Sequence, residues 1–248
     1  MEYEKIEELV NEGKIEEALR LAEEALKENP DDYDLNLLYA DILEALGKSE
    51  KALEVYERLY ELYGDVDLLL AKADLLSRLE RNEDALEVIK RAEEDHPYDR
   101  DVKIMKALIL ANLGRYGEAK EILETLSEQY PEDPEIKLYL GTVLIDEGEE
   151  LDRGVDILLQ LREEEPENPY VWYNLGVGLY KMGDYLKAAE CFEKADSLFE
   201  GEDPDAIYWL AQCMLKLGNK RLAQELAERL LKLGALEEYE DLSKILEK

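Results

Sequence analysis

The chain of 248 residues has very few residues that could perform catalysis or hold a metal. It has one histidine, His96, and two cysteines, Cys191 and Cys213, which do not form a CxxC pair. A Ser-His-Asp triad would have to use His96, and a zinc site of the usual histidine and cysteine type lacks ligands. We therefore expect no enzyme activity, no cofactor and no metal site. We expect both cysteines to be buried free thiols.

Long apolar runs and an excess of positive charge are also absent. No apolar run approaches the roughly 20 residues of a membrane span, and residues 1–5 lack the basic and apolar parts of a signal peptide. Acidic residues number 63 against 30 lysines and arginines, which gives a net charge of −33. Such a surface repels nucleic acid and anionic membranes and attracts cationic partners. We expect a cytoplasmic protein that binds neither nucleic acid nor membrane.

Two columns of small residues recur about every 34 residues, a period typical of solenoid repeats. The first column is Ala18, Ala52, Ala85, Ala119, Gly154, Ala188 and Ala223. The second column, five or six residues earlier, is Gly13, Gly47, Glu80, Gly114, Gly148, Gly183 and Gly218. Each copy divides at the second column into two amphipathic helical patterns, and glycine there suits a turn residue in the left-handed region. These patterns predict an all-α fold of antiparallel helix pairs.

Breaks in the helical patterns set the repeat boundaries. Five copies end at Pro30, Gly64, Pro97, Pro131 and Pro166. Acidic residues follow the breaks, where they would cap the next helix. We predict seven repeats at about 1–32, 33–65, 66–99, 100–133, 134–168, 169–203 and 204–235. A capping helix at 236–248 would cover the last repeat with an apolar stripe formed by Leu236, Tyr239, Leu242, Ile245 and Leu246.

The sixth copy carries a recognisable motif. It reads Trp172-Tyr173-Asn174-Leu175-Gly176, followed by Gly183-Asp184-Tyr185, Ala188, Phe192 and Ala195. This pattern resembles a near-consensus tetratricopeptide repeat, and its recurrence extends the resemblance over residues 1–248 as a single array. The resemblance implies a right-handed superhelical solenoid whose first helices line a concave groove that binds peptides or helices.

A second stripe on the first helices locates that groove. In the sixth copy the stripe lies apart from the packing residues and consists of Tyr170, Tyr173, Val177 and Tyr180. Matching positions are Leu138 and Thr142 in the fifth copy and Tyr208 and Gln212 in the seventh. Some family members bind a C-terminal carboxylate with Lys, Asn and Arg on this face, but only Asn174 matches that set here, which disfavours the activity. The predicted partner-binding residues are Leu138, Thr142, Tyr170, Tyr173, Asn174, Val177, Tyr180, Tyr208 and Gln212.

The favoured function is a non-enzymatic scaffold that binds a protein or peptide partner of basic and apolar character. The tyrosines fit two roles at this stage: anchors for a partner, or packing against neighbouring repeats. Three other functions stay open. These are homo-oligomerisation, an engineered structural scaffold, and an accessory subunit that docks on a large folded enzyme.

Overall fold

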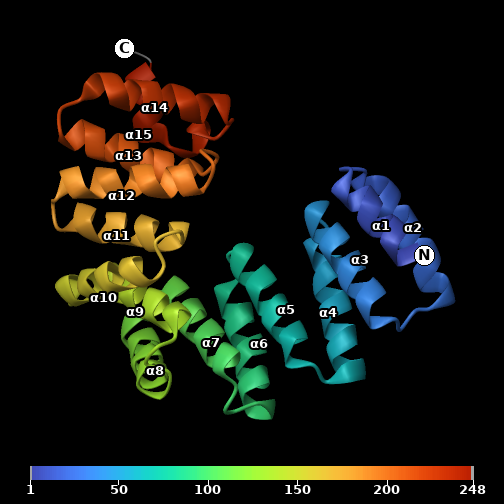
Figure 1. Ribbon diagram of the computed structural model, residues 1–248. Coiled ribbons are helices and arrows are strands. Elements are labelled where there is room, and N and C mark those ends of the chain that lie inside the picture. Colours follow the sequence, from blue (N-terminus) through green and yellow to red (C-terminus); the bar gives the residue numbers. More distant parts are fainter. Residues whose placement is uncertain (1, 247–248) are drawn as a thin grey trace. The chain divides into compact units, whose positions relative to one another are not determined.

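The computed structural model describes residues 2–246 and the side chains of all of these except 2, 237, 240, 245 and 246. Within this range the regular structure is entirely helical, which confirms the predicted all-α class (Figure 1). The helices are α1 (Glu2–Asn11), α2 (Ile15–Glu28), α3 (Tyr33–Ala45), α4 (Ser49–Tyr63), α5 (Val66–Arg78), α6 (Asn82–Asp95), α7 (Arg100–Asn112), α8 (Tyr116–Gln129), α9 (Pro134–Glu147), α10 (Leu151–Glu164), α11 (Pro169–Lys181), α12 (Tyr185–Leu198), α13 (Pro204–Lys216), α14 (Lys220–Lys232), η1 (Leu236–Glu238) and α15 (Glu240–Leu246).

A polar side chain caps the N-terminus of the first helix of each pair from α3 onward. The acidic residues that follow the repeat boundaries in the sequence predict such caps. Asp99 accepts hydrogen bonds from the backbone amides of Asp101 and Val102 at 2.9 and 3.0 Å. Asn168 accepts one from the amide of Tyr170 at 3.0 Å. The same cap is formed by Asp32, Asp65, Asp133 and Asp203. These side chains satisfy amides that have no partner within the helix.

The glycine column forms the turns between paired helices. Its six glycines have φ between +68° and +84°, the left-handed region that glycine adopts without steric cost. Glu80, which replaces glycine in the third copy, adopts the same conformation with φ of +59°. In this turn the Glu80 amide donates to Ser77 O and the Arg81 amide donates to Leu76 O, both at 2.9 Å. The turn geometry is therefore kept although its usual residue is absent.

We expect Glu80→Gly to raise the free energy of unfolding by about 0.5–1 kcal/mol. A non-glycine residue in the left-handed region costs about 1–2 kcal/mol, and the greater freedom of glycine in the unfolded chain offsets about half of that. Urea denaturation followed by circular dichroism measures the change. Gly114→Ala is the matched control because φ is +72° there and an added Cβ meets nothing within 4 Å. It should destabilise by a similar amount. A less stable Glu80→Gly protein would contradict the strain argument.

The column of small residues lies where paired helices cross. Its six alanines have no exposed surface, and Gly154 is buried. A Cβ added at Gly154 would lie 2.8 Å from the carbonyl oxygen of Gly141 on the facing helix α9. Short side chains are needed at such crossings because helix axes approach closely there. The small residues of this column therefore allow the paired helices to approach closely.

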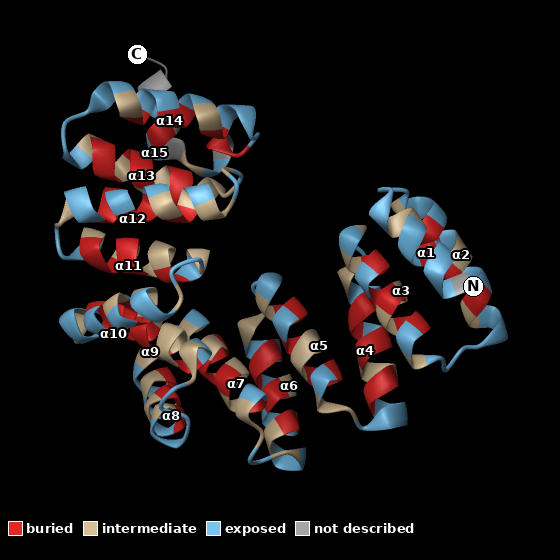
Figure 2. Cartoon of the chain, viewed as in Figure 1, coloured by how far each residue is buried: buried red, intermediate tan, exposed pale blue. Residues whose placement is uncertain are grey.

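The helices form two compact units, residues 1–115 and residues 116–248. In unit 1 each helix from α1 to α7 packs against the next, and in unit 2 the same holds from α8 to α14. Buried residues concentrate where neighbouring helices meet (Figure 2). Each predicted repeat contains one helix pair, and the boundary between the units falls inside the predicted repeat 100–133. Among residues 2–246, no helix has the length and apolar character to cross a membrane.

The C-terminal segment differs from the single capping helix predicted at 236–248. It consists of η1 and the seven-residue α15, separated at Tyr239, whose φ of −119° and ψ of 70° are not helical. Leu236 and Leu242 are 7% and 0% exposed, and both elements pack against α14. The side chains of Ile245 and Leu246 lie outside the described part. The break at Tyr239 turns the chain so that both leucines reach the last helix pair.

Candidate functional site

The first helices of the pairs in unit 2 share one face. Helix α11 contacts both α9 and α13, whereas the second helices of successive pairs lie farther apart. The side lined by α9, α11 and α13 is therefore the narrower side of this unit. All nine predicted partner-binding residues lie on these three helices. Tyr170 is exposed and the other eight are half-buried. We call these nine residues the inner face of unit 2.

Tyr173 packs into the unit more deeply than its position in the stripe indicates. Its ring meets the ring of Phe192 on α12 edge to face, with centroids 5.8 Å apart. Phe192 has no exposed surface and stacks on Trp209 of α13 at 6.1 Å. Burial, and then the charge of Asp205, raise the pKa of Tyr173 to about 12. The ring of Tyr173 therefore packs against the neighbouring helices.

Trp209 connects the aromatic residues of α11 and α13. Besides Phe192, it contacts Tyr180 at 5.0 Å and Tyr208 at 5.5 Å, both edge to face. Tyr180 also contacts Tyr185 at 5.2 Å. Sequence reasoning did not include Trp209 among the partner-binding residues. The sequence does hold a signal for Trp209: it follows Tyr208 in the seventh copy, as the predicted binding residue Asn174 follows Tyr173 in the sixth.

Two polar residues of the inner face, Asn174 and Thr142, bond within their own helices. Asn174 donates from Nδ2 to the carbonyl oxygen of Tyr170 at 2.9 Å. Thr142 donates from Oγ1 to the carbonyl oxygen of Leu138, also at 2.9 Å. Tyr170 is 59% exposed, and its ring meets Phe199 edge to face at 5.3 Å. Of the tyrosines of the inner face, Tyr170 thus presents the most surface to solvent.

Carboxylates surround the aromatic residues. Asp203, Asp205 and Asp146 all raise the pKa of Tyr173 through their negative charge, after the larger effect of burial. Asp146 is paired with Lys181, whose Nζ lies 3.2 Å from its Oδ1. Asp205 instead accepts a hydrogen bond from the Tyr239 hydroxyl at 2.7 Å. The inner face of unit 2 is therefore aromatic with an acidic border.

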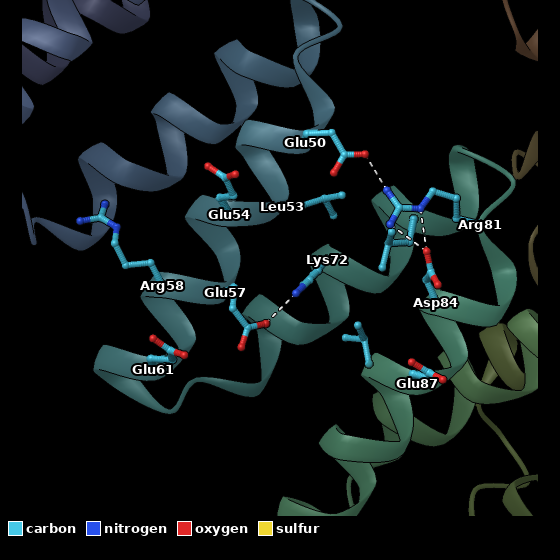
Figure 3. A pocket seen from close by; sticks show the side chains of 12 residues that line it. Glu50, Leu53, Glu54, Glu57, Arg58, Glu61, Lys72, Arg81, Asp84 and Glu87 are labelled. Carbon is cyan, nitrogen blue, oxygen red and sulfur yellow. Dashed lines mark hydrogen bonds and ion pairs between the residues drawn. The ribbon is translucent and has the colours of Figure 1, made fainter.

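Unit 1 contains a hollow of about 560 Å³ between α4, α5 and α6 (Figure 3). Two of its three basic side chains are paired with its own acidic ones: Lys72 Nζ lies 2.6 Å from Glu57, and Arg81 Nη1 lies 2.6 Å from Glu50. Its lining residues are Glu50, Leu53, Glu54, Glu57, Arg58, Glu61, Lys72, Leu76, Arg81, Asp84, Glu87 and Val88. Because ion pairs link the three helices across the hollow, these contacts hold successive pairs of unit 1 together.

The single histidine belongs to unit 1, and both cysteines belong to unit 2. His96 is the residue that follows α6. Cys191 and Cys213 are buried free thiols, as predicted, and burial raises their pKa values to about 11 and 12. Thiols with such pKa values are protonated and weakly nucleophilic at neutral pH. Within residues 2–246, no group of three or more His, Cys, Asp or Glu side chains is placed to hold a metal ion.

Solved structures of repeat proteins share this fold. A tetratricopeptide repeat protein from Parabacteroides merdae has a TM-score of 0.76 at 18% identity, with 99% of this chain and 98% of that chain covered. A thermophilic repeat protein from Thermus thermophilus has a TM-score of 0.66 at 19% identity, covering 74% of this chain and 100% of that one. The APC/C hetero-tetramer Cut9-Hcn1 has a TM-score of 0.68 at 17% identity, covering 92% and 45%. At these identities the likeness shows the fold alone.

Family models show the relationship in the sequence itself. Two models described as tetratricopeptide repeat match the chain, one at residues 3–67 and 70–119 and the other at residues 110–175 and 179–244. No curated protein matches the sequence. The matched residues, the helix pairs and the glycine turns agree, so the chain belongs to the tetratricopeptide repeat family, whose repeats generally mediate protein-protein interaction.

Proposed function

We propose that the chain is a non-enzymatic scaffold that binds a partner segment of basic and apolar character on the inner face of unit 2. The observation that carries the proposal is the cluster of partly exposed aromatic rings on α11 and α13 within an acidic border. Aromatic side chains give large contact area at low entropic cost and are frequent binding anchors. Because one packing stripe is enough to join a helix pair to its neighbours, a second aromatic stripe on α11 favours a binding role.

The partner's chemistry is inferred from charge. With a net charge of −33, the chain attracts cationic segments from a distance and repels anionic ones. Tyrosine rings also accept a cation over their faces. The apolar part of the partner would contact the rings, and its basic part would face the carboxylates. A single continuous array over residues 1–248 and a cytoplasmic location remain predictions alongside this proposal.

Selection from a random-peptide display library tests the proposal. Wild-type protein is expected to enrich basic and apolar peptides, and Tyr170→Ala/Tyr180→Ala to bind them at least about fivefold more weakly, the usual loss at a binding anchor. Tyr173 is left unchanged, because its ring packs on Phe192, a core residue with no exposed surface. Raising the salt concentration should slow association by screening the charges.

The matched control is Tyr98→Ala, which removes a tyrosine that is 89% exposed in unit 1. Its peptide affinity should equal that of the wild type, and circular dichroism should show that all variants fold. Equal affinities of wild type and the Tyr170→Ala/Tyr180→Ala variant would reject the inner face as the site. Light scattering at several protein concentrations separates the alternative of self-association, because a dimer would form without any peptide.

A further inference from the structure

The C-terminal segment lies against two of the residues that we assign to partner binding. Tyr239 stacks on Tyr208, with ring centroids 4.5 Å apart and planes at 20°. The carboxylate of Asp241 accepts hydrogen bonds from the Tyr208 hydroxyl, at 3.3 Å, and from Nε2 of Gln212. The Tyr239 hydroxyl donates in turn to Asp205. One ring face and two hydrogen-bond donors of the inner face are therefore already used by the chain itself.

A partner segment lying along the inner face would need these same groups. Its apolar or aromatic side chains would stack on the rings, and its backbone carbonyls would accept from the hydroxyl and amide donors that Asp241 now uses. We infer that residues 236–246 act as an internal competitor for the α13 end of the inner face, which a bound partner segment displaces. This inference rests on the proposed function and adds a regulation to it.

The short helices of the C-terminal segment favour its displacement by a partner. It consists of a three-residue 3-10 turn and a seven-residue helix, interrupted at Tyr239. Helices of this length are unstable in water without tertiary contacts. The buried side chains of Leu236 and Leu242 and the contacts with α13 supply that support. The loss of the α13 contacts would leave only the packing on α14.

Charge favours an incoming basic segment over the resident one. Residues 236–246 contain four acids and one lysine, a net charge of 1 − 4 = −3, on a chain whose net charge is −33. Within the described part of the chain, neither Asp205 nor Asp241 forms an ion pair with a lysine or arginine. Asp241 accepts from the hydroxyl of one ring of the stacked pair, and Asp205 accepts from the hydroxyl of the other. A cationic segment in this place would reverse the sign of the interaction.

The test uses full-length Tyr239→Ala/Asp241→Ala, which keeps Leu236 and Leu242. Peptides enriched on the wild type from the random display library serve as probes. We expect them to bind the variant about 3- to 10-fold more tightly, because a larger fraction of the protein then has a free inner face. The matched control is Tyr98→Ala/Glu94→Ala, which removes one tyrosine and one acid from exposed positions of unit 1. The control should bind like the wild type or more weakly, since the lost charge reduces attraction.

Hydrogen exchange on the wild-type protein gives a second readout that needs no variant. Amides of residues 240–246 should exchange faster when a probe peptide is bound, and unchanged or slower exchange would overturn the inference. Equal or weaker binding by Tyr239→Ala/Asp241→Ala would overturn it too, and would leave the proposed binding on the inner face unaffected. If neither protein enriches any peptide, the proposed function and the inference both fail.

Discussion

Replacing Phe192 with alanine is expected to lower the free energy of unfolding by about 3–5 kcal/mol, the usual loss for a fully buried phenylalanine. Phe192 is 0% exposed and lies between Tyr173 of α11 and Trp209 of α13. Its ring also fills the space beside Gly176, where an added Cβ would lie 2.8 Å from Phe192 Cε1. Truncation would leave a cavity at the junction of three helices, which neighbouring side chains can fill only in part.

Denaturation in urea measures this loss, and the chain supplies its own control. The only other phenylalanine is Phe199, which is half-buried and meets the ring of Tyr170. Phe199→Ala should cost about 1 kcal/mol, because less apolar surface is removed from contact. Equal losses for the two variants would show that Phe192 is not the centre of the core of unit 2.

The same residue links stability to the proposed binding site. The buried ring of Phe192 packs against the rings of Tyr173 and Trp209. Trp209 in turn contacts Tyr180 and Tyr208 of the inner face. A loss of peptide binding by Phe192→Ala would therefore not show that Phe192 touches the partner. The exposed Tyr170 is the residue whose replacement tests contact with little disturbance of the core.

Gly154→Ala is expected to destabilise the protein by about 1–2 kcal/mol, although alanine is the better helix former. The new Cβ would lie 2.8 Å from the Gly141 carbonyl oxygen, 3.0 Å from Ile145 Cγ1 and 3.1 Å from Leu144 Cβ. Since one of these atoms belongs to the backbone of α9, the two helices must move apart. Overpacking of this kind costs about 1–3 kcal/mol, and the helix propensity of alanine returns up to about 1 kcal/mol.

Gly117→Ala is the matched control, because Gly117 also lies in a helix and an added Cβ there meets nothing within 4 Å. This change should stabilise the protein by about 0.5 kcal/mol through helix propensity alone. Opposite signs for the same substitution would establish close helix approach as the reason for glycine at position 154. A Gly154→Ala protein as stable as the wild type would contradict it.

The helix pairs, their turns and their crossings were predictable from the sequence because each depends on residues close together in the chain. A left-handed turn residue, a capping carboxylate and a small crossing residue act within one repeat, and their recurrence made the pattern reliable. Even Glu80 kept its turn, because the hydrogen bonds at both sides of it impose the backbone conformation. The sequence also places Tyr170 and Tyr180 on one helix, because helical periodicity depends only on spacing within the repeat.

Tertiary structure decided how deeply each aromatic side chain of the cluster is buried and which other rings it contacts. Helical periodicity gives the direction in which Tyr173 points, but the rings that cover it come from α12 and α13, and the contact between Trp209 and Tyr180 joins residues of successive repeats. The docking of Tyr239 and Asp241 on α13 likewise depends on how the chain turns after α14. The sequence by itself thus determined the repeat and its helices, because these follow from local backbone preferences. Only packing between repeats decided which aromatic surfaces stay open, because side chains distant in sequence cover the others.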